Sequence, residues 1–249
     1  MNLITNNTDK FTSVSLKDMD NVKLMNRTDT KFAFSVKKLS DLFNKIIPFY
    51  NILEIDNKRI HYYKSLYFDT SDRKFYNDHH NQRVNRHKVR FREYVDSGLK
   101  FLEIKHKTNK GKTVKKRIKV KQIDNELSTD SKEFINKIIG SSHDIVACQW
   151  INFKRITLVH KLLKERLTLD LDLSFYNDKS KGELKEVIIA EVKQERMSRE
   201  SDFIRLSKEM GIHPIKISKY CYSSFELDNS LKHNRFKEKR MYINKLKQE

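Results

Sequence analysis

Basic and apolar side chains alternate along residues 86–120. In residues 86–94 the basic side chains occupy every second position, namely Arg86, Lys88, Arg90 and Arg92. The same alternation returns in residues 101–107 and 113–120, where charged side chains share one parity and apolar side chains the other. Side chains two positions apart on a strand point to the same side, so the pattern predicts three strands, each with one charged and one apolar face. Turns at Asp96-Ser97-Gly98 and Asn109-Lys110-Gly111 are expected to join them as hairpins.

The rest of the chain combines further strands of this kind with three amphipathic helices. Strands are expected near residues 23–32, 60–69, 150–159, 166–173 and 187–193. The helices are expected to begin at Ser35, Asp130 and Ser198 and to end at Pro48, Gly140 and Gly211. Residues 214–220 are interpreted as a short, partly strand-like segment.

About eight strands with a charged face predict an α+β fold built on an eight-stranded antiparallel β-barrel. The lumen is expected to be polar and basic, with the helices packed outside on the apolar face. The alternative is an inverted barrel with an apolar interior and the basic rows in solvent, which leaves the helices less to cover. We expect residues 1–20 to form an N-terminal arm, residues 21–228 the barrel domain, and residues 229–249 a peripheral basic C-terminal tail.

The composition fits a folded protein that binds polyanions. The 249 residues include 52 Lys and Arg against 33 Asp and Glu, a formal net charge of +19. A field of this sign attracts phosphates, nucleic acid or anionic lipid. Cys148 and Cys221 show no metal-ligand spacing and are expected to be free core thiols in a reducing compartment. No apolar run approaches membrane-spanning length and the N-terminus lacks a signal-peptide core, so we expect a cytoplasmic protein without an integral membrane segment.

The four cations of residues 86–92 need an anionic partner. At an effective dielectric of about 20, two unit charges about 7 Å apart repel by roughly 2 kcal/mol. Solvent and salt can screen one such row, but three adjoining rows favour a phosphate-rich ligand. Arg and Lys bind phosphate oxygens, and carboxylates among them can hold Mg²⁺ or Mn²⁺. Glu191 is the first choice as a metal ligand. Behind it come Glu103 and either Asp170 or Asp172, and each acid could instead be a salt-bridge partner.

Short motifs occur along the chain in a particular order: RTDTKF, SLYFDT, RHKVRFREY, FLEIKHK, the KKR strand, FKR, ERLTLD, IAEVK and SKY. Over about residues 20–225 this series resembles the VTC (vacuolar transporter chaperone) domain, the polyphosphate polymerase branch of the CYTH or triphosphate tunnel metalloenzymes. The resemblance implies an eight-stranded tunnel that transfers the terminal phosphate of ATP, with Mn²⁺ or Mg²⁺, to a growing polyphosphate chain. Hydrolytic tunnel enzymes typically carry E-x-E-x-K on the first strand. Here Arg27 precedes Asp29, which favours the polymerase branch.

The resemblance also assigns roles to individual positions. It implies phosphate binding by Lys31, Arg86, Arg90, Arg92, Lys105, Lys115 or Lys116, Arg155, Arg166 and Lys219. The residues expected to carry catalysis are Arg90, Arg92, Lys105, Arg155, Arg166 and Glu191, with Glu191 and then Glu103 as metal ligands. Phe153 stands where the family pattern often has Tyr, so a hydroxyl contact is expected to be lost.

Three functions remain open from the sequence. The first is a polyphosphate polymerase whose partners are a nucleoside triphosphate and polyphosphate. The second is a triphosphatase of the same fold that acts on inorganic or organic triphosphate. The third is a non-catalytic protein that binds polyphosphate or nucleic acid. Acids spaced regularly among the bases repel a nucleic-acid backbone, so no specific nucleic acid is expected.

Overall fold

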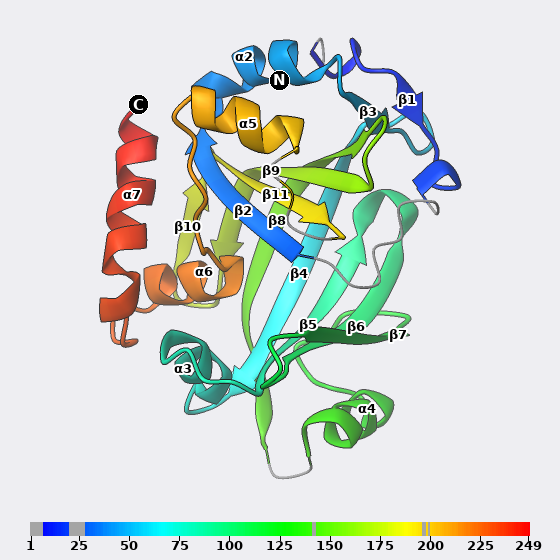
Figure 1. Ribbon diagram of the computed structural model, residues 1–249. Helices are drawn as coiled ribbons and strands as arrows, with labels where there is room; N and C mark the ends of the chain where they lie inside the picture. The colour runs from blue at the N-terminus through cyan, green and yellow to red at the C-terminus, as the bar shows by residue number, and fades with distance from the viewer. Residues whose placement is uncertain (1–6, 20–27, 141–142, 196–197, 199) are drawn as a thin grey trace.

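The computed structural model describes residues 7–19, 28–140, 143–195, 198 and 200–249. Its strands belong to one 11-stranded sheet against which the helices pack (Figure 1). The strands are β1 (Ser13–Val14), β2 (Thr28–Ser35), β3 (Tyr50–Leu53), β4 (Ile60–Thr70), β5 (Arg86–Tyr94), β6 (Leu99–Lys107), β7 (Thr113–Lys119), β8 (Ile145–His160), β9 (Glu165–Tyr176), β10 (Lys181–Leu184) and β11 (Val187–Gln194). The α-helices are α2 (Leu39–Ile46), α3 (Lys74–His80), α4 (Thr129–Ile139), α5 (Asp202–Glu209), α6 (Lys219–Leu227) and α7 (Lys237–Gln248).

Eight strands form one antiparallel path in the order β2-β11-β9-β8-β4-β5-β6-β7. The path curves so far that residues of all eight strands line one central pocket. The antiparallel sheet with helices is as predicted, but the sheet is not closed into an eight-stranded barrel. Within the described residues, β2 and β7 at the ends of the path share no backbone pairing. Pro214 bridges to Phe32 at β2, and the Ile215 N–H donates to the Lys31 carbonyl at 2.8 Å, so this segment pairs with β2.

The face of the sheet that points away from the pocket is apolar and covered by helices, as predicted. Over β2, β9 and β11, it packs against α2 and α5, where Leu42, Phe43 and Phe203 are fully buried. Over β4, β5 and β6, it packs against Ile135 of α4. Burial of these side chains is the main stabilising contribution of each helix. The inverted barrel, with the basic rows in solvent, is therefore wrong.

A β-bulge in β9 reverses which face its leucines occupy. The register between β8 and β9 shifts between Asn152 and Lys154, where Asp172 has φ +50°. Before the bulge Leu171 packs on the outer face, and after it Leu173 packs on the inner face. One extra residue in a strand exchanges its two faces. Asp172 consequently lies outside the pocket, 2.8 Å from the Lys154 ammonium, and is not a companion of Asp170 as the alternation predicted.

One end of the inner face is filled by an apolar cluster that includes α6 and α7. Tyr220 and Phe225 of α6 pack there with Ile243 and Leu246 of α7. In Figure 1, α6 lies beside the lower end of α7, and α7 contacts β2. Residues 229–249, predicted as a peripheral tail, therefore contribute to the core, and Ile243 is fully buried.

The helix termini confirm one predicted N-cap and correct two others. Ser35 caps the first helical segment, as predicted. The second helix is capped by Ser128 and not by Asp130, and the third by Ser201 and not by Ser198. Residues 219–220, predicted as partly strand-like, open α6.

Other expectations concern the first strand, the thiols and the membrane. The first strand is described only from Thr28, so Lys23, Met25 and Arg27 lie outside the described residues. Cys148 and Cys221 are buried free thiols, as predicted. In the part of the chain that the structure describes, no helix combines the length and the apolar composition needed to cross a bilayer.

Candidate functional site

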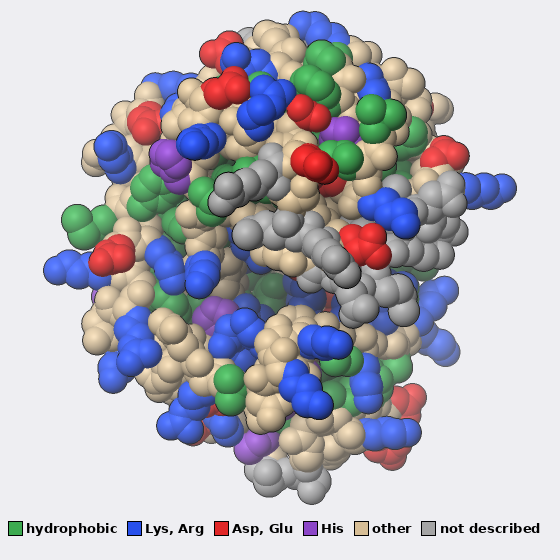
Figure 2. Space-filling view, in the orientation of Figure 1, with side chains coloured by type: hydrophobic (Ala, Val, Ile, Leu, Met, Phe, Trp, Pro, Cys, Tyr) green, Lys and Arg blue, Asp and Glu red, His purple; other side chains and the backbone are tan. Residues whose placement is uncertain are grey.

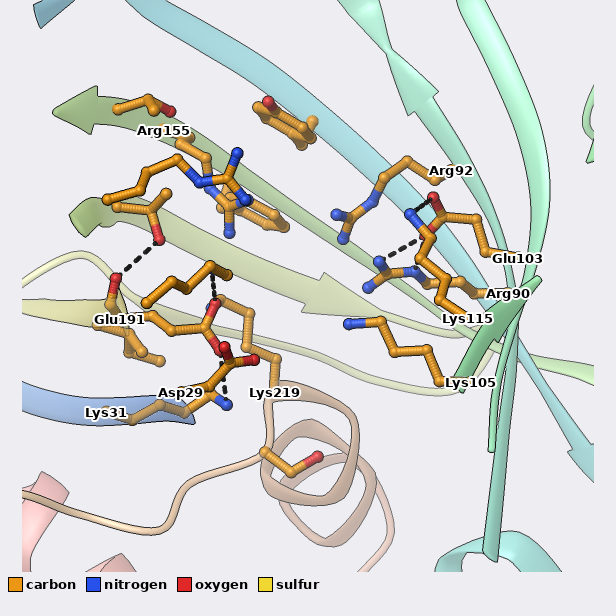
Figure 3. Close-up of a pocket in the computed structure, with 18 of the residues that line it drawn as sticks. Asp29, Lys31, Arg90, Arg92, Glu103, Lys105, Lys115, Arg155, Glu191 and Lys219 are labelled. Atoms are coloured by element: carbon orange, nitrogen blue, oxygen red, sulfur yellow. Dashed lines mark hydrogen bonds and ion pairs between the residues drawn. The ribbon is translucent and has the colours of Figure 1, made fainter. Parts of the chain in front are cut away.

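The inner face of the sheet lines a central pocket of about 380 Å³ in which cations predominate. Its cations are Lys31, Lys88, Arg90, Arg92, Lys105, Lys115, Arg155, Arg166, Lys193 and Lys219, and its acids are Asp29, Glu103 and Glu191. In Figure 3, side chains from opposite walls point toward one another across the cavity. Lys and Arg side chains also gather around a hollow on the surface in Figure 2. Such an excess of positive charge in a concave space favours a polyanionic ligand.

On the wall formed by β5, β6 and β7, two cations hold one buried acid. Glu103 is 0% exposed, and its Oε2 accepts hydrogen bonds from Arg90 Nε at 3.0 Å and Nη2 at 2.7 Å. Lys115 pairs with the other carboxylate oxygen. Burial alone would raise the pKa of Glu103, but the charges of Arg90, Arg92 and Lys115 hold it well below its usual range. Glu103 therefore stays ionised and orients Arg90, whose Nη1 donates to Tyr67 Oη at 2.9 Å.

The opposite wall repeats this arrangement with different residues. Asp170 on β9 is 2% exposed and accepts hydrogen bonds from Arg155 Nε at 2.6 Å and Nη2 at 2.8 Å. Lys219, the first residue of α6, also donates to Asp170. Although burial opposes it, these charges hold the pKa of Asp170 well below its usual range. A paired Arg fork of this kind is fixed in orientation, so Asp170 positions Arg155 as Glu103 positions Arg90.

Glu191 on β11 lies between two lysines. Its Oε1 is 2.8 Å from the ammonium of Lys31, its register partner on β2, and its Oε2 accepts from Lys193. Lys193 and Lys31 hold the pKa of Glu191 well below its usual value even though burial acts in the opposite direction. Burial lowers the pKa of Lys193 to about 8, and Glu191 only partly opposes this shift. Unlike the fully buried Glu103, Glu191 is partly accessible from the pocket, because its side chain is 17% exposed.

Arg92 and Lys105 have no carboxylate partner among the described residues. Arg92 is 7% exposed and donates from Nε to Ser65 Oγ at 3.2 Å. The side chain of the partly buried Lys105 makes no hydrogen bond or ion pair within the described ranges. Burial and the charge of Arg90 lower the pKa of Arg92 to about 10 and that of Lys105 well below its usual value. A desolvated cation without a counter-ion is unfavourable, so both side chains favour an anionic ligand between the walls.

Aromatic rings support the guanidinium groups of both walls. Tyr63 and Phe153 stack with ring centroids 5.2 Å apart and planes 2° from parallel. Arg92 and Arg155 both lie 5.1 to 5.5 Å from the centroids of these rings. Cation–π contacts of this kind hold a guanidinium plane while its N–H groups stay available for other partners.

The first turn of α6 reaches the pocket and is fixed by polar contacts. Ser218 caps the helix and accepts a hydrogen bond from Lys88 Nζ at 2.8 Å. Tyr220 Oη donates to Asp69, a fully buried carboxylate that also accepts backbone N–H groups at the start of α3. The Tyr220 ring stacks on Tyr67 at 5.1 Å. These contacts hold the turn that presents Lys219 to the pocket.

Most of the predicted phosphate-binding residues line the pocket. Arg86 lies on the same face of β5 but beyond the lining, and its guanidinium donates to the Arg83 carbonyl at 2.8 Å. Of the alternatives Lys115 and Lys116, Lys115 is part of the lining and Lys116 is not. The chemical role of each lining residue stays a prediction.

The sequence analysis missed two cations of the pocket, Lys88 and Lys193, as site residues. Both share the parity of predicted site residues on their own strands, so the alternation already contained this signal. Tyr63 and Tyr67 were also missed. Nothing in their local sequence separates a ring that supports a guanidinium from one that packs in the core.

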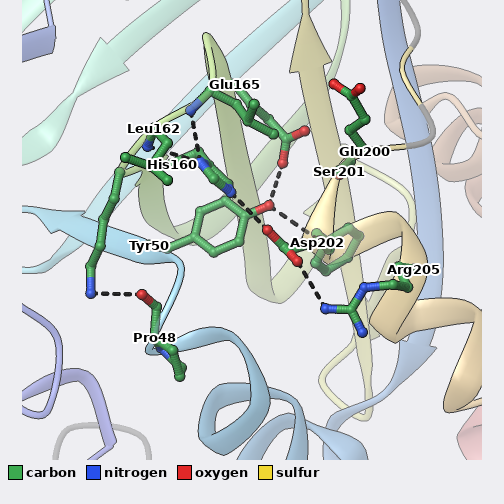
Figure 4. Close-up of polar contacts among 12 residues, drawn as sticks. Pro48, Tyr50, His160, Leu162, Glu165, Glu200, Ser201, Asp202 and Arg205 are labelled. Carbon is green, nitrogen blue, oxygen red and sulfur yellow. Dashed lines mark hydrogen bonds and ion pairs between the residues drawn. The ribbon is translucent and has the colours of Figure 1, made fainter.

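A further buried polar network lies beside α5 and outside the pocket (Figure 4). Tyr50 Oη donates to Glu165. His160 Nδ1 accepts the backbone N–H groups of residues 162–163, so Nε2 carries the proton and donates to Asp202 at 3.0 Å. Both ring nitrogens of His160 are occupied by hydrogen bonds. His160 therefore anchors the first turn of α5 and is not free to act as a general base.

A divalent cation in the pocket would need carboxylate ligands from the acids that line it. Within the described residues, no three His, Cys, Asp or Glu side chains form a group that could hold a metal. Magnesium sites usually combine one or two carboxylates with substrate phosphates, so fewer protein donors suffice. Glu191 fits this requirement together with Asp29, which lies on the adjacent strand opposite Lys193. Basic side chains bind both oxygens of Glu103 and of Glu191 alike. Glu103 fits the requirement less well, because it is 0% exposed whereas the Glu191 side chain is 17% exposed.

Three solved structures are similar to this chain at low sequence identity. A putative adenylyl cyclase from Hippeastrum, reported with a dominant triphosphatase activity, is 14% identical, with 82% of this chain and 97% of that chain covered and a TM-score of 0.49. A putative adenylate cyclase from Bacillus halodurans is 12% identical, with 78% and 96% covered and a TM-score of 0.47. One from Vibrio parahaemolyticus is 12% identical, with 78% and 96% covered and a TM-score of 0.45. Similarity at this level supports no inference about activity.

The sequence itself was compared with curated proteins and with family models. No curated protein matches it. The model of the VTC domain family matches residues 26–226, which contain every strand of the eight-strand path and all residues that line the pocket from Thr28 onward. The chain therefore belongs to the VTC domain family.

Proposed function

We propose that the central pocket binds the triphosphate of ATP and transfers its terminal phosphoryl group to a polyphosphate chain. The observation that carries the proposal is the pair Arg92 and Lys105, buried or partly buried cations without a carboxylate partner in the described residues. A phosphate chain between the walls would neutralise both of them. Membership of the VTC domain family supports the same class of ligand, and Arg27 before Asp29 favours the polymerase branch. In this proposal the curved sheet serves as a triphosphate tunnel although β2 and β7 do not pair with each other within the described residues.

In the proposed reaction the bond between the terminal phosphorus and the oxygen that bridges it to the β-phosphate breaks. ADP leaves with that oxygen, and a terminal oxygen of the polyphosphate chain forms the new bond to phosphorus. Negative charge grows on the leaving oxygen, where fixed cations stabilise it without further reorganisation. The residues proposed to hold phosphate oxygens are Lys31, Arg90, Arg92, Lys105, Lys115, Arg155, Arg166 and Lys219.

We propose Glu191 as the principal ligand of Mn²⁺ or Mg²⁺, with Asp29 beside it. When bound there, such an ion would supply charge neutralisation to the phosphate groups. To serve as a ligand, Glu191 has to exchange its contacts with Lys31 and Lys193. The two lysines then become available to the phosphates.

Incubation of the purified protein with ATP and Mn²⁺ tests the proposal. We expect chains that an exopolyphosphatase destroys. Free phosphate without long chains would identify a triphosphatase instead. Binding of ATP without turnover would identify a binding protein, and either result contradicts the proposed polymerase.

Glu191→Gln tests the metal-binding role. The substitution keeps the shape of the side chain and removes its charge, so we expect triphosphate binding to persist while turnover with Mn²⁺ falls about 100-fold or more. Glu183→Gln is a matched control, because Glu183 is exposed on β10 and lies outside the pocket. Undiminished turnover by the Glu191→Gln protein would remove Glu191 from the mechanism.

A further inference from the structure

Four cations form a second group beside the central pocket, which we call the outer basic cluster. Its members are Arg86, Lys107, Lys216 and Lys239. Arg86 and Lys107 are register partners on β5 and β6. Lys216 precedes α6, and Lys239 lies in the first turn of α7. The cluster thus gathers residues that are up to 153 positions apart in the sequence.

The outer basic cluster is electrostatically unbalanced. Burial, Arg86 and Lys216 all lower the pKa of Lys107, and no acid opposes them. Burial and Lys216 also lower the pKa of Lys239, although Cys221 and Glu238 act in the opposite direction. Within the described residues, no carboxylate forms an ion pair with any of the four cations. Like charges in register on adjacent strands destabilise a sheet, so a ligand that neutralises them is expected.

The outer basic cluster continues the basic rows of the pocket. Arg86 extends the β5 row beyond Lys88, and Lys107 extends the β6 row beyond Lys105, in each case on the face that lines the pocket. Ile217 and Ser218 line both the central pocket and a small neighbouring cavity, whose other lining residues include Lys216 and Lys239. The two groups of cations therefore lie on either side of the residues that open α6.

We propose that the outer basic cluster binds the part of a polyphosphate chain that extends beyond the central pocket. The inference rests on the proposed function, since it assumes that the pocket holds the chain end. Successive cations on a strand are about 7 Å apart, which suits a linear anion that carries charge along its whole length. A short triphosphate that fills the pocket does not reach this cluster. Chain length should therefore decide whether the cluster contributes to binding.

The test compares Lys107→Ala/Lys216→Ala with Lys132→Ala/Lys137→Ala. Neither the Lys107 nor the Lys216 side chain makes a hydrogen bond or ion pair within the described residues. Removing both side chains should therefore leave the fold intact, as checked by thermal unfolding. Lys132 and Lys137 are exposed on α4 and lie outside both groups of cations. The control removes the same charge from another surface.

Affinities for tripolyphosphate and for long-chain polyphosphate are measured at several salt concentrations. For Lys107→Ala/Lys216→Ala we expect about three- to tenfold weaker binding of the long chain and a shallower salt dependence, because fewer counter-ions are released. Tripolyphosphate affinity should stay within about twofold, and the α4 control should behave as the wild type with both ligands.

Two sets of results would overturn the assignment. One is an equal loss for both ligands or no loss for the long chain. The other is that single-stranded RNA, at equal phosphate concentration, displaces the long chain from the wild-type protein but not from Lys107→Ala/Lys216→Ala. That result would make the cluster a nucleic-acid site. A wild-type protein that fails to bind tripolyphosphate, yet binds the long chain through these lysines, would refute the proposed function and leave the outer basic cluster standing.

Discussion

At the residue scale, position on the strand decides which cation faces the pocket. Lys115 and Lys116 are adjacent, yet of the two only Lys115 lines the pocket and pairs with Glu103. Alternation predicts this difference, but it does not say which cations are paired. Lys105 has the same parity as Glu103 on the same strand and nevertheless lacks a carboxylate partner within the described residues. That distinction depends on side chains brought together from other strands.

Lys105→Ala should weaken tripolyphosphate binding by about ten- to a hundredfold. A hydrogen bond to a charged group contributes about 1.5–3 kcal/mol, and Lys105 has no other partner in the described residues to compensate for its loss. Without ligand, the midpoint of thermal unfolding should stay unchanged or rise, because a partly buried, uncompensated charge is removed. Isothermal titration calorimetry and thermal unfolding measure the two effects.

Lys116→Ala is the matched control for this substitution. It removes the same charge from the neighbouring strand β7 at an exposed site, so both affinity and thermal midpoint should stay close to wild type. If Lys116→Ala weakens binding as much as Lys105→Ala does, the ligand responds to net charge and not to the pocket.

At the scale of the elements, the alternation of side chains predicts most strands but not the bulge in β9. Leu171 and Leu173 have the same parity and look like neighbours on one face, while the structure places them in different cores. The left-handed conformation of Asp172 causes this, and a non-glycine residue carries no clear sequence signal for it. The sequence likewise does not predict whether the sheet closes, because closure depends on whether a strand or the segment at Pro214 pairs with β2.

Helix α6 is the element whose position the sequence analysis could not supply. Only three-dimensional packing brings Tyr220 to the buried carboxylate of Asp69, which lies 151 residues away. The contact fixes the turn that carries Lys219 to Asp170. Positioning of a phosphate-binding lysine therefore depends on a tyrosine outside the set of charged residues.

Tyr220→Phe should lower the free energy of unfolding by about 1–3 kcal/mol, because Asp69 would lose one of its donors while remaining buried. It should also weaken tripolyphosphate binding, since the first turn of α6 would be less firmly held. Tyr222→Phe, on the same helix, is the control. The buried Tyr222 hydroxyl has no hydrogen-bond partner among the described residues, so its loss should be nearly neutral. Equal effects of the two substitutions in chemical denaturation and calorimetry would contradict the role of the Asp69 contact.

At the scale of the whole molecule, the net charge of +19 is not spread over the surface alone. Part of it is concentrated in the pocket, where ten cations face three acids. Packing by the outer helices and by the cluster around α6 and α7 stabilises this arrangement against its own repulsion. Composition alone predicts a polyanionic partner, whereas its location on the inner face follows only from the curvature of the sheet.

Concentrated charge makes ligand binding depend on pH. Lys193 has a pKa of about 8 in the free protein because of its burial, compared with 10.5 for an ordinary lysine. A phosphate ligand stabilises the charged form of Lys193 and raises this pKa. Ligand binding is therefore accompanied by proton uptake at any pH at which Lys193 of the free protein is partly deprotonated. Below about pH 7, Lys193 is protonated in both states and adds no pH dependence. As the pH rises above 8, affinity for tripolyphosphate should fall by up to about tenfold per pH unit for each such lysine.

Calorimetry at pH 8.5 in two buffers with different ionisation enthalpies measures the protons exchanged on binding. We expect uptake by the protein, and a smaller uptake in Lys193→Arg, because a guanidinium stays charged throughout this range. Lys105, whose pKa is also lowered, should account for part of the uptake that remains. Proton release, or an affinity that stays constant between about pH 7 and 9.5, would show that the buried lysines do not contact the phosphates.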